Sequence, residues 1–506
     1  MKQHLPFVSV IMDAMKLPHS LKPRRARGAV LALAACVSLA GNAQVNDLPD
    51  LGESARAELS PQMERRIGES IMNEIRLREP GYVDDPEIND YLGRLGRRLV
   101  EASANPTGEF HFFAIRDNTV NAFAMFGGYI GVNTGTLLTA QSESELAGVL
   151  AHEIAHVTQN HLARQIAKEK QNTIPTLIAM AIGVLAARSN TSVAAGAMAS
   201  AQAGMIQAQL AYSRDFEREA DRVGFQSLER AGFDVHGMGD FFERLQKAGR
   251  LYENNAPVYF RSHPLTVERL SDMQNRAQDS PYRQVVSSLD FQLVRAKLRV
   301  QALPPKDARA EFERLLEEKK YVSEAAVRYG LAYALLRARD LEGARRVSAA
   351  LEALRVESPI LAGLAASIGE QSGDFAGAQE IYRQALLRFP GARSLVYGYA
   401  DSLYAAGSHR QALAFLDGQL ARDPSDFRLF GLQAKTYAAL GRRVPQRRAQ
   451  AEYYLLQGQL GAAIEQLQLA QKEKDGDFYE LSAVDARLRE LRKLQMEEER
   501  KGMNGG

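Results

Sequence analysis

The chain has 506 residues, 45% of them hydrophobic, which is enough for two or more domains with cores of their own. Its 63 basic and 61 acidic residues leave a net charge of +2, so composition gives no electrostatic basis for binding nucleic acid. Because Cys36 is its one cysteine, the chain cannot form an internal disulfide bond.

The first 43 residues are typical of an export signal. Basic residues over 22–27 precede an apolar stretch over 28–40 that is too short to span a bilayer. Small residues over 41–43 suit cleavage before Gln44. We therefore predict a signal peptide over 1–43.

Two features leave the processing of this segment open. Residues 33–36 (Leu-Ala-Ala-Cys) resemble a bacterial lipobox, which would make the mature protein a lipoprotein anchored through Cys36. The residues after Cys36 remain apolar, which fits a continuing signal core better. The start is also open, because Met12 or Met15 could be the true initiator.

The next segment is predicted to be helical and then β-structured. Ser60-Pro61 opens one helix with apolar residues every four positions, and a second helix runs over 86–102. Short strands are predicted at 110–115, 121–124 and 129–132, with a turn at Gly127-Gly128. An exposed strand could hold an extended peptide across a catalytic site, and the alternative is a hairpin packed on the core.

An H-E-x-x-H motif occupies 152–156. On a helix, His152 and His156 lie at i and i+4, so both imidazoles project from one face, as two ligands of a tetrahedral Zn²⁺ require. Glu153 is placed to accept a proton from water at such a metal and to pass it to a leaving amine. The alternative is a helix that carries two surface histidines by chance.

A capping box and an apolar stripe support a helix around this motif. Ser142 and Glu145 form the S-x-x-E box, and no Gly or Pro interrupts the motif. We expect the same helix to continue towards Arg164. His161 then lies five residues past His156, about 140° further round, and should point away from the metal as a surface or second-layer histidine. His111, His236 and His409 are single and are predicted to be structural.

A region of apolar and small residues over 174–211 follows. Its apolar core of fourteen residues, 174–187, is too short for a transmembrane helix. We predict a helical hairpin near the cleft that either makes peripheral membrane contact through 174–211 or covers the site. The favoured alternative is a hairpin buried in the core.

Candidates for a third metal ligand lie over 215–221, a helical segment rich in acids. Glu217 and Asp221 are i and i+4 on one face, so Glu217 could bind zinc while Asp221 hydrogen-bonds a ligand histidine. Spacing alone does not choose between Glu217 and Glu219. A solvated charged helix is the alternative.

The last chemical motif is His263-Pro264 with Arg269. Because Pro264 suits a first helical turn, His263 lies at a helix entrance. His263 and Arg269 could stabilise the oxyanion of a tetrahedral intermediate, or His263 could cap the open zinc position at rest. The alternative is a loop histidine and a surface arginine.

Together these motifs resemble the gluzincin metallopeptidases, which include CAAX-prenyl endopeptidase and the bacterial heat-shock membrane protease. That pattern is H-E-x-x-H, then E-x-x-x-D on a later helix, then H-P with an arginine six residues after the histidine. The resemblance covers about 55–275, a zinc metallopeptidase domain that we place at 50–275, and implies Glu217 over Glu219 as third ligand. It also implies a substrate-binding edge strand within 121–130. Phe126 departs from the family, which usually has Pro there, and leaves the local turn in doubt.

A period of 34 residues marks the C-terminal half. Gly373, Gly407 and Gly441 follow it, as do three alanines (Ala344, Ala378, Ala412) and two prolines (Pro390, Pro424). This is the tetratricopeptide pattern, which builds an α-solenoid that binds protein partners. We predict a linker helix over 276–304, repeats over 305–495 and a disordered tail over 496–506. The fold class is therefore mainly α: an α+β zinc peptidase domain followed by an α-solenoid.

A signal peptide, this peptidase domain and these repeats together resemble one branch of the family. That resemblance implies a periplasmic zinc endopeptidase, with one Zn²⁺ per chain, that hydrolyses unfolded or misassembled outer-membrane proteins. It also implies a chaperone-like role in the assembly and quality control of these proteins, with contact to the barrel assembly machinery through the repeats. The alternative is a repeat-based chaperone or scaffold with a latent peptidase site. A structural zinc in a non-catalytic protein is a third reading.

Overall fold

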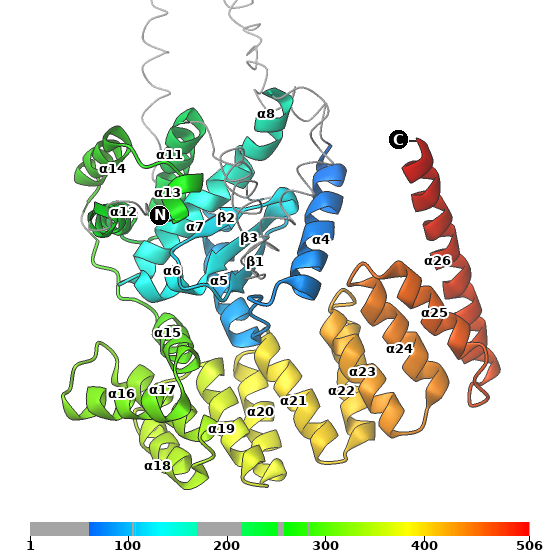
Figure 1. The fold of residues 1–506 in the computed structure, drawn as a ribbon. Coiled ribbons are helices and arrows are strands. Elements are labelled where there is room, and N and C mark those ends of the chain that lie inside the picture. The colour runs from blue at the N-terminus through cyan, green and yellow to red at the C-terminus, as the bar shows by residue number, and fades with distance from the viewer. Residues whose placement is uncertain are drawn as a thin grey trace, which may run out of the picture. The chain divides into compact units, whose positions relative to one another are not determined.

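The computed structural model describes residues 60–103, 106, 108–168, 214–250, 258–281 and 283–504 (Figure 1). The predicted signal peptide, Cys36 and the apolar region 174–211 lie outside these residues. The chain divides into Met1–Glu53 and Ser54–Gly506, and the structure below is that of the second unit. Among the residues described, no helix is both long enough and apolar enough to cross a membrane.

Two helices precede the sheet, and each begins where the sequence supplies a cap. Helix α4 (Pro61–Arg78) starts after Ser60, whose hydroxyl accepts a hydrogen bond from the Met63 backbone N–H. Helix α5 (Pro86–Glu101) starts after Asp85, whose carboxylate accepts from the next two free N–H groups. Proline at the first helical position suits both starts, because its missing N–H would have no partner there.

The sheet has three strands in the order β1-β3-β2 (Figure 1). Strand β3 (Tyr129–Asn133) is central, pairing in parallel with β1 (His111–Ile115) and antiparallel with β2 (Ala122–Ala124). Of the two segments expected to form the edge strand, β2 therefore lies at an edge and β3 does not. The turn η2 (Phe126–Gly128) forms despite the absent proline, since Gly127 and Gly128 supply φ of 71° and 78°.

The motif helix is α7 (Glu143–Thr158), which follows the short helix α6 (Thr134–Thr139) and contacts β2. Ser142 caps its start, as the capping box predicts. The expectation that this helix continues to Arg164 was wrong. It stops at Thr158, Asn160 adopts a φ of 51°, and a new helix α8 (His161–Lys168) begins. Asn tolerates this left-handed conformation and commonly ends helices.

Four further helices complete this half of the described chain: α11 (Arg214–Arg230), α12 (His236–Arg250), α13 (Val258–Ser262) and α14 (Val267–Asp279). Helices α11 and α12 both pack on α7. The contact between α7 and α11 is close because Gly224 has no side chain: a Cβ there would lie 3.0 Å from the Ala151 and His152 backbone. This approach lets two buried polar faces meet.

The C-terminal half is a row of helices, each packed on its neighbours (Figure 1). They are α15 (Leu289–Ala302), α16 (Pro305–Glu317), α17 (Glu324–Arg337), α18 (Leu341–Glu352), α19 (Pro359–Gln371), α20 (Phe375–Arg388), α21 (Arg393–Ala405), α22 (His409–Leu420), α23 (Phe427–Ala439), α24 (Arg443–Leu455), α25 (Leu460–Ala470) and α26 (Phe478–Asn504). The mainly helical class, with a small sheet followed by repeats, is confirmed. Two details differ from expectation: α14 and α15 replace a single linker helix, and residues 496–504 belong to α26 and are not a disordered tail.

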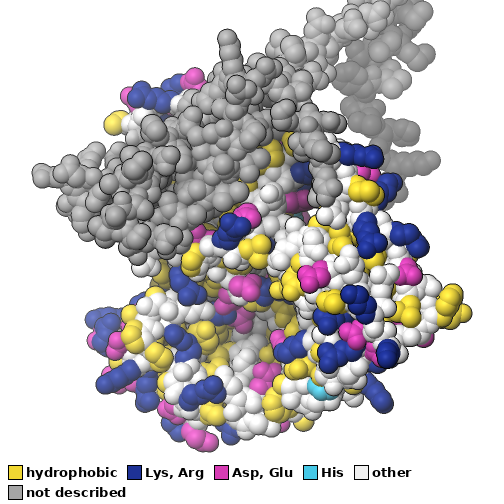
Figure 2. Space-filling view, turned by 45° about the vertical axis from the view of Figure 1, so that its right-hand side comes forward, with side chains coloured by type: hydrophobic (Ala, Val, Ile, Leu, Met, Phe, Trp, Pro, Cys, Tyr) yellow, Lys and Arg dark blue, Asp and Glu magenta, His cyan; other side chains and the backbone are white. Residues whose placement is uncertain are grey.

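The two halves share contacts and a continuous apolar core that runs from α5 and α7 into α19. Lys297 on α15 is 8% exposed, and its ammonium lies 2.6 Å from a carboxylate oxygen of Asp85 and of Glu87. On the face shown in Figure 2, basic and acidic side chains of the described residues intermingle. The repeats are therefore held to the N-terminal half of the described chain by both apolar packing and a buried ion-pair cluster.

Candidate metal centre

Helix α7 presents His152, Glu153 and His156 to the interior, and none is more than 1% exposed. Helix α11 brings Glu217 and Asp221 to the same place, with exposures of 0% and 3%. Charged and polar side chains are rarely buried unless they are paired or bind a metal. Such a cluster therefore requires a specific arrangement to be stable.

The three predicted ligands converge. Nε2 of His156 lies 3.3 Å from Oε1 of Glu217, and Nε2 of His152 lies 3.5 Å from Oε2 of Glu217. The two Nε2 atoms are 3.0 Å apart. A tetrahedral zinc with bonds of about 2.0–2.1 Å separates its ligand atoms by about 3.3 Å, so the observed spacing fits this ion.

The acid beside them has no hydrogen-bond partner of its own. Both carboxylate oxygens of Glu153 are buried and accept no hydrogen bond from the described residues. Nε2 of His263 lies 3.4 Å from Glu153 Oε1. A buried carboxylate without donors is costly, so its retention here fits a group that receives a proton from water at an adjacent metal.

Asp221 and Arg269 hold His152 from behind. Nδ1 of His152 lies 3.0 Å from Asp221 Oδ1, and the Arg269 guanidinium donates to both Asp221 oxygens at 2.6 and 2.8 Å. Arg269 also lies 2.6 Å from Glu217 and donates to the Pro264 carbonyl at 2.7 Å. Since Arg269 is only 2% exposed, these contacts fit positioning of the acids better than the oxyanion role that we predicted.

The charges of these groups are coupled. Burial disfavours a charged His152, but hydrogen bonds to Asp221 and Glu217 outweigh burial and raise its pKa to about 10. Burial alone would raise the pKa of the Glu217 carboxyl, but the neighbouring histidines outweigh burial and hold this pKa well below the usual range. The centre without metal therefore favours a proton on His152, which a metal ion must displace.

His263 enters the same cluster from the end of α13. The predicted helix entrance at His263 was wrong, because the next helix, α14, begins only after its cap Thr266. Nδ1 of His263 lies 3.1 Å from Glu217 Oε1 and 3.3 Å from His152 Nε2. Four residues each offer one ligand atom here, and these atoms all lie within 4.8 Å of one another: His152, His156, Glu217 and His263. The ring of His263 stacks on Tyr259 at 4.7 Å, which fixes its orientation. His263 therefore lies where a fourth ligand would be.

The direction of His161 was predicted wrongly from the sequence, although the second-layer alternative fits its position, and Glu219 lies outside the four candidate ligands. His161 does not point away: its Nδ1 lies 2.9 Å from Nδ1 of His156, and its Nε2 lies 3.2 Å from Glu219 Oε2. Burial lowers the pKa of His161 to about 4 against the opposing effect of Glu219. The signal that could have revealed this was Asn160, which ends α7 and redirects the chain.

Another small cavity lies beside the metal centre and touches the edge strand. Ala124 of β2, Met125 and His156 line it together. A segment paired to the free edge of β2 would therefore pass close to His156.

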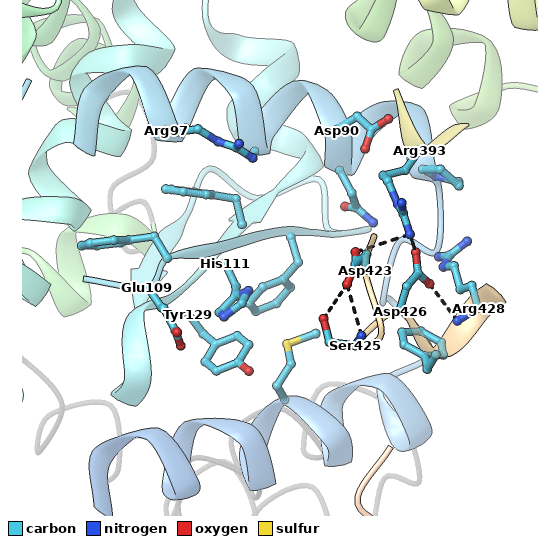
Figure 3. A pocket seen from close by; sticks show the side chains of 18 of the residues that line it. Asp90, Arg97, Glu109, His111, Tyr129, Arg393, Asp423, Ser425, Asp426 and Arg428 are labelled. Atoms are coloured by element: carbon cyan, nitrogen blue, oxygen red, sulfur yellow. Dashed lines mark hydrogen bonds and ion pairs between the residues drawn. The ribbon is translucent and has the colours of Figure 1, made fainter. Parts of the chain in front are cut away.

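A larger cavity of about 1180 Å³ lies between α4, α5, β1 and the α22–α23 connection, and none of the metal-centre residues lines it (Figure 3). Its charges are mixed, and several are paired within its wall. Arg393 contacts both Asp423 and Asp426, and Asp423 also accepts from Ser425 (Figure 3). This cavity therefore offers no field of one sign to a ligand.

Comparison with known proteins places this geometry in a family. Residues 86–277 match the model described as peptidase family M48, and residues 371–436 match a tetratricopeptide repeat model. The first match contains every residue of the metal centre.

Relatives resemble the chain beyond the peptidase half. A relative in Vibrio cholerae is 37% identical over 316 residues, which cover 62% of this chain and 64% of that relative. The beta-barrel assembly-enhancing protease of Escherichia coli strain K12 is 32% identical over 458 residues, covering 88% of this chain and 92% of that protein. A mitochondrial metalloendopeptidase of Schizosaccharomyces pombe is 29% identical over 186 residues, covering 36% of this chain and 51% of that protein.

Proposed function

This chain belongs to peptidase family M48, and we propose that it is a zinc-dependent endopeptidase of the bacterial periplasm. His152, His156 and Glu217 would hold the zinc. When bound, zinc would act as a Lewis acid on the scissile carbonyl and make nearby water more acidic. The convergence of two imidazoles and a distant carboxylate at ligand spacing is the single observation that carries the proposal.

The residues around this centre would have separate tasks. Glu153 would take a proton from the attacking water and return it to the leaving amine. Asp221 would hold His152 through Nδ1, and Arg269 would keep Asp221 and Glu217 ionised and in place. Because all these groups are buried, the electrostatic interactions between them would be screened less by water and would be stronger than at the surface.

Replacing Glu153 with Gln tests the assignment of the base. The variant keeps the shape of the side chain but loses its capacity to accept a proton. We expect zinc content near one per chain and a fall in cleavage of denatured casein of about 10²–10⁴-fold. Glu69→Gln on α4 is the matched control and should cleave normally. Undiminished cleavage by pure Glu153→Gln would remove Glu153 from the mechanism.

His263 supports a second candidate, a repeat-based chaperone or scaffold whose peptidase is latent at rest. With His263 as fourth ligand, the tetrahedral zinc would have no open position for water. X-ray absorption of the zinc-loaded resting protein separates the candidates: four protein ligands indicate latency, and three plus water indicate a competent enzyme. His263→Ala should then open the position, although it also removes a possible oxyanion donor.

We further propose that the substrates are extended polypeptides. The edge strand β2 and His156 border the same small cavity, so a segment added to β2 by main-chain hydrogen bonds would be led to the metal. The Escherichia coli relative is a beta-barrel assembly-enhancing protease, which supports a role in β-barrel assembly. On that basis, unfolded or misassembled outer-membrane proteins are the proposed clients, with the repeats contacting the barrel assembly machinery.

A capture experiment tests the clients. Zinc-loaded Glu153→Gln protein should retain uncut outer-membrane proteins and assembly components from a bacterial envelope extract. Protein with His152, His156 and Glu217 replaced by Ala serves as control, because it should lose the clients that depend on the metal centre but keep partners held by the repeats. Capture of no envelope protein above bare resin would contradict the proposed partners.

A further inference from the structure

The two histidine ligands are supported on their far sides in different ways. Each turns Nε2 towards the metal position, which leaves Nδ1 facing the protein. Nδ1 of His152 meets the carboxylate of Asp221 directly, at 3.0 Å. Nδ1 of His156 lies 2.9 Å from a second imidazole nitrogen, Nδ1 of His161.

His161 connects His156 to a carboxylate. Nε2 of His161 lies 3.2 Å from Glu219 Oε2, and the same oxygen accepts a hydrogen bond from Arg164 Nη1 at 2.9 Å. His161 has no exposed side-chain surface, whereas Glu219 is 25% exposed. A second imidazole thus bridges the distance between the buried ligand and an acid near the surface.

The ring of His161 is fixed in plane as well as in position. It stacks on Phe216 at a centroid distance of 4.5 Å and an angle of 12°. The Arg164 guanidinium lies over the same Phe216 ring at 4.6 Å. Helix α8 therefore has a defined docking surface on α11, and both residues of α8 that contact Glu219 are held there.

We propose that Glu219 and His161 form a positioning relay that orients His156 and fixes its tautomer for metal binding. A histidine that binds metal through Nε2 must carry its proton on Nδ1. His156 Nδ1–H then donates to Nδ1 of His161, and His161 Nε2–H donates to Glu219. The relay rests on the proposed metal site and assigns roles to two residues outside the ligand set.

The relay depends on the break between α7 and α8. On a continuous helix, His161 would lie about 140° away from His156 and could not reach its Nδ1. The left-handed Asn160 ends α7 and starts α8, which returns His161 to the back of His156. Helix α11 consequently contacts His156 from two sides. Glu217 lies beside its Nε2, and Glu219 reaches its Nδ1 through His161.

Replacing His161 with Phe tests the relay. Phe keeps the stacking on Phe216 but removes both nitrogens, so we expect zinc to bind about 10–100-fold more weakly. The dissociation constant is measured against a chromophoric chelator in the Glu153→Gln background, where no self-cleavage interferes. The thermal midpoint of the metal-free protein should stay the same, since the effect is on the metal.

Two further variants keep the test decisive if His161→Phe folds poorly. His161→Asn retains an acceptor near the Nδ1 position and should recover part of the zinc affinity. Glu219→Gln removes the charge that anchors His161 and should lose less affinity than His161→Phe. His236→Phe is the matched control, because His236 also contacts a carboxylate, Asp234 at 2.9 Å, but lies outside the centre.

The outcomes separate the relay from the metal site itself. Wild-type affinity in His161→Phe, or an equal loss in His236→Phe, would overturn the relay and leave the zinc site standing. An equal affinity loss in the Asn and Phe variants would also contradict it, because the acceptor would then be irrelevant. Failure of the unaltered centre to bind zinc would overturn both proposals.

Discussion

The metal centre and the repeats are stabilised by opposite kinds of contact. In the centre, buried charged groups meet across long sequence separations: His152 and His263 are 111 residues apart, and Asp221 and Arg269 are 48 apart. In the repeats, caps such as Asp374 bond three residues ahead, to the Gly377 N–H, and many ion pairs are exposed. The stability of the centre therefore depends on a few buried contacts, each of which is essential. The stability of the repeats depends on many local contacts that each contribute little.

Removing the buried cation should give the largest effect. Arg269→Met leaves Asp221 and Glu217 buried without their guanidinium, and breaking a buried pair in this way costs about 3–5 kcal/mol. We expect the metal-free variant to unfold at clearly lower denaturant concentration, and added zinc to restore part of the stability by supplying positive charge.

The matched control comes from the repeats. Arg383 on α20 contacts Glu380 at 2.6 Å, but both side chains are more than half exposed. Arg383→Met makes the same chemical change, and its unfolding midpoint should match that of the unaltered protein. Equal losses in the two variants would show that burial does not distinguish the two regions.

The same contrast decides what sequence alone could predict. The capping box, the i and i+4 histidines, and the 34-residue period are local patterns, and the helices and repeats that they predict are present. The fold class followed from them. The local patterns did not predict which acid faces the histidines. Spacing favoured Glu217 and Glu219 equally, and only the resemblance to a family distinguished them.

The errors around His161 have a physical cause. Angular arithmetic along a helix holds only while the helix continues, and one left-handed residue, Asn160, ended it. The linker helix was misjudged because Ser288 caps α15 and so begins a separate helix, and the tail was misjudged because α26 continues to Asn504. Contacts between distant segments are thus where sequence reasoning stopped.

A smaller loss is expected where two helices touch. A Cβ on Gly224 would lie 3.0 Å from the Ala151 carbonyl and the His152 N–H, so Gly224→Ala must push α11 away from α7. Overpacking of this kind costs about 1–3 kcal/mol. Because α11 carries Glu217, zinc affinity measured by chelator competition should fall as well.

A glycine in open space provides the control for that substitution. Gly93 lies within α5, and a Cβ there would meet nothing within 4 Å. Gly93→Ala should leave zinc affinity unchanged and raise stability by up to about 1 kcal/mol, the usual gain for Ala in a helix. Loss of zinc affinity in both variants would mean that contact between α7 and α11 is not what places Glu217.

The smallest effect should come from a turn between repeats. Gly407 has a φ of 76°, and a Cβ there would also meet nothing within 4 Å. Gly407→Ala therefore adds only the backbone cost of a left-handed alanine, about 1–2 kcal/mol, without any clash. Gly418→Ala, in the adjacent helix α22 with equal open space, should be neutral or stabilising. Zinc affinity should be the same in both variants, because strain at this turn stays within the repeats and does not reach the metal centre. A change in the zinc affinity of Gly407→Ala would show that the two regions are coupled.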